Sequence, residues 1–128
     1  MNKGRAEQLG GKLSFPSKMD CPASTCRVGS ILAQQPDSTC ADCYAAKGTF
    51  RFKNVKGILE DNYEKLWNPE WTPAILAQIR WEARDRFRWF MSGDLQGENH
   101  LRNIIQICDA TRHLRHWLPT REIAVVLA

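Results

Sequence analysis

Four of the five cysteines lie close together in the first third of the chain. Cys21 and Cys26 form one pair, and Cys40 and Cys43 form a second pair after thirteen intervening residues. Thiolates two to four residues apart can bind one metal ion, and two such pairs complete a tetrahedral sulfur site for zinc. Four thiolates can equally hold a [4Fe–4S] cluster. The spacing therefore predicts one metal centre with these four cysteines as ligands. The alternatives are unligated thiols or a redox Cys-x-x-Cys pair.

The segment after Cys43 favours iron–sulfur over zinc. Its Tyr-Ala-Ala sequence is typical of a helix, so we expect a short helix at 40–48 that begins at the metal centre. Amide groups at a helix N-terminus would donate hydrogen bonds to cluster sulfurs and stabilise their negative charge. Zinc stays the alternative cofactor. Cys108 follows Ile104 by four residues on the apolar side of a predicted helix, so we expect it in the core and not at the centre.

Length and composition predict one domain in a reducing compartment. The chain has 128 residues, of which 43% are hydrophobic, enough for a single modest core. It has no run of about 18 apolar residues and no N-terminal signal sequence, so we expect a cytoplasmic protein without a membrane span. In the cytoplasm, clustered cysteines more often bind metal than form disulfides. We divide the domain into a cysteine-rich metal-binding region, 1–48, and a region of helices and βα units, 49–128.

The positive charge is concentrated around the cysteines. The net charge is +4, and residues 1–56 hold nine Lys/Arg against four Asp/Glu. This excess would offset the negative charge of a thiolate-bound centre, or would attract nucleic acid. The basic and aromatic run at 47–53 could stack on a nucleic-acid strand. A solvated basic face with its aromatic side chains turned inward is the more common explanation.

Hydrophobic periodicity predicts an α/β fold with a small partial βα-repeat sheet. Residues 1–39 show no helical or strand period apart from one short strand at 12–18, and are expected to be a loop organised by the metal centre. The later pattern predicts, in order, a helix at 54–67, a helix from Asn68 with Pro69 in its first turn, a strand at 86–91, a helix at 98–113, a strand at 114–119 and a helix at 120–128. Strands that alternate with helices over short links are typical of parallel βα units.

Polar side chains follow both predicted strands. Asp94 comes after the first strand and Arg121 after the second. Ligands of open and barrel βα folds bind at the C-terminal ends of the strands. We therefore expect Asp94 and Arg121 on the same edge of the sheet, as cofactor-binding residues that share a pocket with the metal centre. The alternative is that Asp94 and Thr120 only cap the helices that follow.

Four motifs, taken in order, give the chain a resemblance to a known family. They are Cys21-Pro22, CADCYAAKG.FRF at 40–52, FRWFMSGDLQ at 87–96 and HWLPTRE at 116–122. With them the chain resembles the bacteriophage gene product 88 family over residues 12 to 125. That family is similar in turn to radical S-adenosylmethionine barrel proteins. The resemblance implies a cluster held by Cys21, Cys26, Cys40 and Cys43 that faces Asp94 and Arg121.

The resemblance and the motifs together leave three functions open. The first is a phage-encoded [4Fe–4S] protein of the host cytoplasm, in which the cluster is structural or serves redox or sensing. The second is a radical S-adenosylmethionine-like enzyme with a partial barrel. The third is a zinc-stabilised module that binds nucleic acid, a host protein or a phage protein. The chain has too few βα units for a closed barrel, and four cysteines instead of the three that leave one iron open. These features favour the non-catalytic protein, with self-association as a further expectation.

Overall fold

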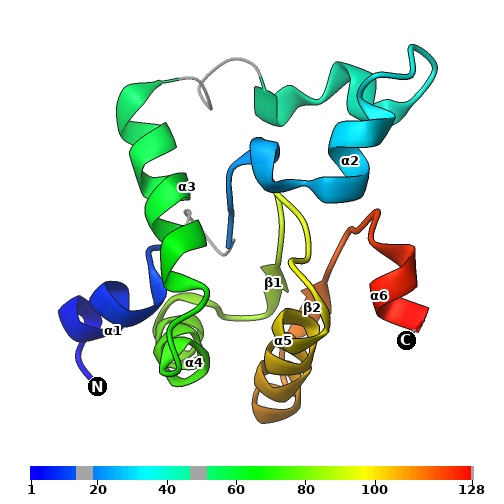
Figure 1. Cartoon of the computed structure of the whole chain (residues 1–128). Helices are drawn as coiled ribbons and strands as arrows, with labels where there is room; N and C mark the ends of the chain where they lie inside the picture. Colours follow the sequence, from blue (N-terminus) through cyan, green and yellow to red (C-terminus); the bar gives the residue numbers. More distant parts are fainter. Residues whose placement is uncertain (14–18, 47–51, 128) are drawn as a thin grey trace.

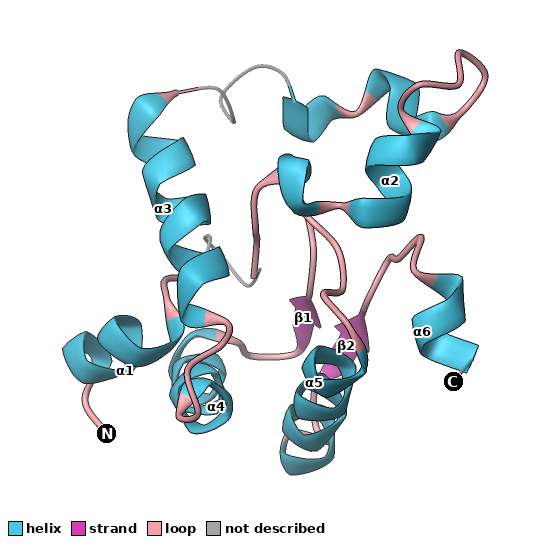
Figure 2. Ribbon diagram, viewed as in Figure 1, coloured by secondary structure: helices cyan, strands magenta, loops and turns pink. Residues whose placement is uncertain are grey.

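A computed structural model describes residues 1–13, 19–46 and 52–127 (Figure 1). These residues form six α-helices, three short 3₁₀ turns and one small sheet, with the broad character of an α/β fold. Most of the described chain is helix and loop, and the strands are short (Figure 2). The elements are α1 (Lys3–Gly10), η1 (Ala23–Thr25), α2 (Arg27–Leu32), η2 (Thr39–Asp42), η3 (Tyr44–Ala46), α3 (Lys53–Lys65), α4 (Trp71–Glu82), β1 (Arg86–Arg88), α5 (Glu98–Ala110), β2 (Arg115–Trp117) and α6 (Ile123–Leu127).

The two strands are parallel, as the alternation of strands and helices predicts. Arg86 pairs with Arg115 and Arg88 with Trp117 in the register of β1 and β2. Each strand has only three residues, fewer than the sequence pattern suggests. The chain stays extended beyond β1, where the Trp89 amide donates to the Trp117 carbonyl at 2.9 Å. A second segment covers the other edge of β1, because the Met19 amide donates to the Arg88 carbonyl at 3.2 Å.

The main hydrophobic core lies between α4, α5 and one face of the strands. Phe87 and Trp89 are 1% and 0% exposed and alternate with the more accessible Arg86 and Arg88, so their face of the strand points into the core. Among residues whose burial is described, none between 20 and 65 belongs to this core. Its members are Met19, Leu66, Trp71, Ile75, Ile79, Ala83, Phe87, Trp89, Phe90, Leu95, Ile104, Ile107 and Leu114. Cys108 is partly buried and packs against them, in agreement with the position expected for it.

The N-terminal region contains helices that the sequence pattern does not predict. The expectation of a loop over residues 1–39 is wrong for α1, whose first turn is capped by the Asn2 side chain at 2.8 Å from the Arg5 amide. Helix α1 buries only a few small or apolar residues, so its helical period is too weak to recognise. It packs closely on α4, because a Cβ at Gly10 would meet the Ala74 Cβ at 3.0 Å. Most of the strand expected at 12–18 lies outside the described residues.

The helix expected at 40–48 is wrong over the part that the structure describes. Two separate 3₁₀ turns, η2 and η3, stand in its place, and residues 47 and 48 lie outside the described range. Cys43 separates the turns with an extended backbone, φ −60° and ψ 117°. A regular helix N-terminus that would donate amides to a cluster is therefore absent from the described part of this segment.

The remaining helices agree with the sequence pattern, with shifted ends. Helix α3 covers the expected range, although Ile58 and Trp67 on its expected apolar side are 38% and 59% exposed. Helix α4 begins at Trp71, because Asn68 caps a preceding turn through its side chain, 2.9 Å from the Glu70 amide. None of the helices in the described residues has the length and apolar character needed to cross a bilayer.

Candidate functional site

Three of the four clustered cysteines line one cavity of about 350 Å³. We call it the thiol cavity. Cys26 lies just before α2, Cys40 lies in η2, and Cys43 follows η2. Gly29 of α2 forms part of the wall: a Cβ at this position would lie 3.7 Å from the Cys40 Sγ and 3.8 Å from the Cys26 Sγ. The complete lining is Ser24, Cys26, Gly29, Ser30, Ala33, Cys40 and Cys43.

Cys21 does not line the thiol cavity. It is 1% exposed and lies against the turn that follows β1, where its amide donates to the Ser92 carbonyl at 3.0 Å. A Cβ at Gly93, which has a φ of +87°, would approach the Cys21 Cβ to 2.8 Å. The four expected ligands are therefore arranged as three thiols around a cavity and a fourth thiol packed against the end of β1.

A network of hydrogen bonds holds the segment that leads into Cys21. The buried Asp20 carboxylate accepts from the Met91 and Ser92 amides at 2.7 and 3.1 Å. Asn62, buried on α3, donates to the Asp20 carbonyl at 2.9 Å. Asn62 also joins Lys12, accepting from its amide at 2.7 Å and donating to its carbonyl at 3.0 Å. The sequence gives no signal for this role of Asn62, because the residue sits within an otherwise ordinary helical pattern.

Burial makes two of these thiols, Cys21 and Cys26, harder to ionise by raising the pKa of each. Burial, followed by the charges of Asp20 and Cys26, raises the pKa of Cys21 to about 12. Burial also raises the pKa of Cys26 to about 12, with Asp94, the neighbouring cysteines and Glu122 adding to the effect. Two carboxylates, those of Asp94 and Glu122, are therefore close enough to Cys26 to act on its thiol. Arg27 offsets one of them partly, with its Nε 3.9 Å from the Glu122 carboxylate.

Asp94 and Arg121 lie next to each other at the C-terminal ends of the strands. The Arg121 amide donates to the Asp94 carboxylate at 2.7 Å. That carboxylate also accepts from the Leu95 amide at 2.7 Å and from the Thr120 hydroxyl at 2.5 Å. Asp94 is 4% exposed. Its carboxylate therefore accepts mainly from the chain itself, and these hydrogen bonds join the turn after β1 to the turn after β2. A cofactor-binding role for Asp94 and Arg121 stays a prediction.

The cysteine region is tied to these strand ends by several further contacts. The Gln96 side chain donates to the Thr25 carbonyl at 3.1 Å, and the Val28 amide donates to the Glu122 carboxylate at 3.2 Å. The Tyr44 hydroxyl donates to the Met91 carbonyl at 2.6 Å. Figure 1 shows the result, with the blue and cyan segments around α2 above the ends of the strands. The thiol cavity therefore belongs to the end of the fold at which βα proteins bind their ligands.

The geometry of the described residues limits what the cysteines could hold in this arrangement. No group of three or more His, Cys, Asp or Glu side chains is placed to hold a metal ion within residues 1–13, 19–46 and 52–127. Zinc requires thiolate sulfurs about 2.3 Å from one point, so the arrangement does not fit a single tetrahedral ion. The Ser92 hydroxyl, buried beside Cys21, has no hydrogen-bond partner among the described residues.

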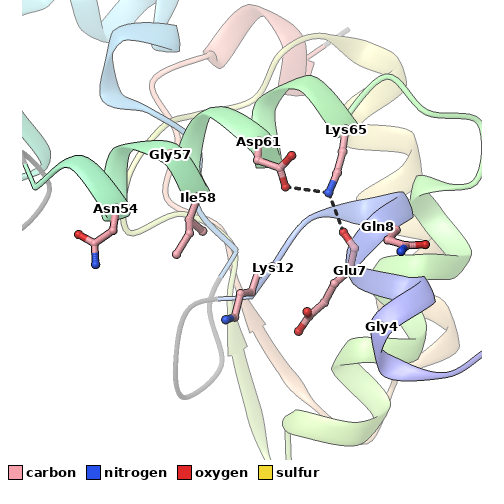
Figure 3. A pocket seen from close by; sticks show the side chains of 9 residues that line it. All are labelled: Gly4, Glu7, Gln8, Lys12, Asn54, Gly57, Ile58, Asp61 and Lys65. Carbon is pink, nitrogen blue, oxygen red and sulfur yellow. Dashed lines mark hydrogen bonds and ion pairs between the residues drawn. The ribbon is translucent and has the colours of Figure 1, made fainter.

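A larger cavity of about 490 Å³ lies between α1 and α3, and no cysteine lines it. Figure 3 shows the Lys65 amine between Asp61 and Glu7, with the Nζ 2.8 Å from the Asp61 carboxylate and 3.0 Å from the Glu7 carbonyl. These contacts join α3 to α1 and account for the polar side chains there. The cavity is open and carries no cluster of nucleophilic or metal-binding groups, so we place the candidate site at the cysteines.

Comparison with known proteins gives one match. The model of the family described as gene product 88 matches residues 2–128. No curated protein and no solved structure matches the chain.

Proposed function

The chain belongs to the phage gene product 88 family, and we propose that it binds a [4Fe–4S] cluster in the thiol cavity. The observation that carries the proposal is the position of three cysteines, Cys26, Cys40 and Cys43, around one cavity of about 350 Å³. A four-iron cluster is several ångströms across, so its thiolates stand further apart than the ligands of a single ion. This difference in size is the reason to propose a cluster, and not zinc, for a cavity of this volume.

The cluster would stabilise the cysteine region, which is held to the strand ends by hydrogen bonds and not by the main core. Cys26, Cys40 and Cys43 lie in or beside short helical turns, and their region contributes no described residue to the main core. Metal centres contribute folding free energy on the order of 10 kcal/mol in small metal-binding domains. A bound cluster that is also able to accept electrons would supply redox or sensing chemistry, and that activity is part of the proposal.

Anaerobic reconstitution tests the proposal. The full chain is supplied with ferrous iron and sulfide under reducing conditions, and absorbance near roughly 400 nm is followed together with iron and sulfide content. We expect about four of each per chain. Cys26→Ser, Cys40→Ser and Cys43→Ser should each lose most of the bound iron, whereas Cys108→Ser should keep it. Equal iron content in the wild-type chain and in Cys43→Ser would contradict the proposal.

Cys21→Ser tests the fourth ligand. Cys21 lies outside the thiol cavity in this arrangement, and the charge of Cys26 is one of the causes that raise its pKa. If Cys21 completes the ligand set, Cys21→Ser should lose iron as fully as Cys43→Ser does. Iron content that stays near the wild-type value would assign the cluster to three cysteines. Bound zinc with no sulfide would instead favour the zinc-stabilised module that binds nucleic acid or another protein.

A radical S-adenosylmethionine-like reaction is the second candidate. Two parallel strands that end beside the cysteines support it, because this is the ligand-binding end of βα folds. The Asp94 carboxylate is already engaged by three donors of the chain, which reduces its availability to a cofactor. The test adds S-adenosylmethionine and a reductant to the cluster-loaded chain. Repeated production of 5′-deoxyadenosine would establish the enzyme, and its absence would favour the non-catalytic protein.

A further inference from the structure

The face of the sheet that points away from the core is basic and aromatic. Arg86 and Arg88 alternate with the buried Phe87 on β1, so their side chains point to the opposite face. On β2, Arg115 and Trp117 pair directly with these two arginines, and paired residues of neighbouring strands point to the same side. Three arginines and a tryptophan therefore share one small face, which we call the arginine face.

The arginine face is open to solvent. Trp117 is 60% exposed, a high value for the largest side chain. The Arg86 side chain is 79% exposed, and Arg115 is also exposed. In the main core, α4 and α5 cover the other face of the strands through residues such as Ile79 and Ile107. The fold thus buries one face of its sheet and leaves the arginine face available to a partner.

Among the described residues, only one carboxylate lies close to the charges on the arginine face. Arg86 and Arg115 lie directly opposite each other, and like charges in this position destabilise a pair of strands. Arg86 lies 3.6 Å from the Asp85 carboxylate, an exposed pair that contributes little. Arg115 makes no ion pair with any residue that the structure describes. An anionic partner would remove the repulsion that the fold retains here.

The Trp117 ring on this face is held in position by a neighbouring side chain. The Arg88 guanidinium lies over the Trp117 ring, 4.5 Å from its centroid, a cation–π contact that fixes the indole. Arg88 is fixed in turn, because it donates to the Phe90 carbonyl at 3.0 Å and to the Tyr44 hydroxyl at 3.2 Å. Strand spacing of about 4.8 Å and a rise of about 3.3 Å per residue bring all four side chains within the length of a few nucleotides.

We propose that the arginine face binds single-stranded nucleic acid, with Trp117 stacking on a base and Arg86, Arg88 and Arg115 contacting phosphates. Binding of single strands combines a positively charged surface with exposed aromatic rings, and this face carries both. A protein strand that paired with β2 would leave the opposed arginines unneutralised, so a nucleic acid is the better match in charge. None of these four residues lines the thiol cavity, and the proposal does not depend on a bound cluster.

Fluorescence anisotropy with labelled oligo(dT) and oligo(rU) tests the proposal on the full chain. Trp117→Ala should weaken binding by roughly 5- to 100-fold, the loss that corresponds to one base stack. Trp117→Tyr should restore most of the affinity, which separates stacking from a general loss of structure. Trp81→Ala is the matched control, because Trp81 is 50% exposed on α4, and it should leave binding within about 2-fold of wild type, a change far below one stack.

A second pair of variants tests the phosphate contacts. Arg115→Ala should reduce the slope of log affinity against log salt by about 0.7, whereas Arg80→Ala on α4, with the same loss of charge, should not. Heparin, which has charge but no bases, should compete weakly and be insensitive to Trp117→Ala. The proposal is overturned if Trp117→Ala binds like Trp81→Ala, if heparin competes as well as oligo(dT), or if no binding occurs at about 100 µM chain in low salt.

Discussion

Residues 66–114 and residues 21–46 are held together by different interactions. The first region contributes nearly every member of the main core, including Trp71, Trp89 and Ile107, each at most 1% exposed. The second is built of short helical turns, contributes no described residue to that core, and is fastened by hydrogen bonds to strand ends. One region is stable through apolar burial, and the other depends on polar contacts. We therefore expect that binding of the proposed cluster would change the stability of the second region much more than that of the first.

The largest expected effect on the free energy of unfolding comes from truncation of a core side chain. Trp89→Ala removes a side chain that is 0% exposed and stacks on His116, and should lower the free energy of unfolding by about 3–5 kcal/mol. Ile31→Ala in the cysteine region removes a side chain that is 66% exposed and should change it by less than about 0.5 kcal/mol. Urea unfolding followed by circular dichroism measures both. Equal losses would show that the two regions share one core.

Acid should destabilise the core region through His100. The ring is 5% exposed, and burial lowers its pKa to about 4. The unfolded chain binds a proton at this residue below pH about 6.5, whereas the folded chain does so only near pH 4, so stability falls as the pH drops between these values. The loss approaches about 3 kcal/mol over this window.

The control for acid destabilisation is His100→Asn, which lacks the titrating ring. The free energy of unfolding of wild type and variant is measured from pH 7 to pH 4. Parallel curves for the two chains would contradict the prediction. A steeper fall in the wild-type chain alone would assign the effect to His100.

Removal of the Asp20 carboxylate tests the hydrogen bonds that join the two regions. Asp20→Ala leaves the amides of Met91 and Ser92 without this acceptor and should cost about 1–3 kcal/mol. Asp37→Ala, at an exposed position, is the matched control and should be nearly neutral. Hydrogen exchange should show the Cys21 amide losing protection in Asp20→Ala, while amides of α5 keep theirs. A uniform loss of amide protection across the chain would mean that the two regions open together as one unit.

The smallest expected effect concerns Ser92. Its buried hydroxyl has no hydrogen-bond partner among the described residues, so Ser92→Ala should change the stability of the metal-free chain by less than about 0.5 kcal/mol, or raise it slightly. If a bound cluster accepts a hydrogen bond from this hydroxyl, the same variant should weaken the cluster-loaded chain. Thermal unfolding of both forms compares the two. A large loss in the metal-free chain would show that Ser92 has a partner in the protein.

The sequence predicts the βα half of the fold far better than the cysteine half. Helices α4 and α5 bury apolar side chains at helical spacing, and the alternation around Phe87 marks β1 clearly, so periodicity is sufficient there. Helix α1 depends instead on a cap at Asn2 and a close approach at Gly10, neither of which produces a period. The helix predicted over 40–48 is wrong because the helix propensity of Tyr-Ala-Ala does not determine the backbone conformation of Cys43, which is extended.

The candidate site could be predicted only in part, because its geometry depends on long-range polar contacts. The spacing of the cysteines identifies the region, but it cannot separate Cys21, which lies against Gly93, from the thiols of the cavity. The strand-end motifs place Asp94 and Arg121 side by side, yet the engagement of Asp94 by Thr120 follows from tertiary structure. Like charges at Arg86 and Arg115 become opposed only through the strand register.

The hydrogen bonds of Asn62 have a consequence for synthesis of the chain on the ribosome. Asn62 donates to the carbonyls of Lys12 and Asp20, which precede it by 50 and 42 residues. The Asp20 carboxylate accepts from the amides of Met91 and Ser92, which are synthesised later still. The thiols of Cys21 and Cys26 therefore emerge into the cell well before the residues that fix their surroundings, and these long loops close late in folding. Throughout that interval these two cysteines lack the burial that raises their pKa to about 12 in the folded chain, so their thiols are more reactive during synthesis than after it.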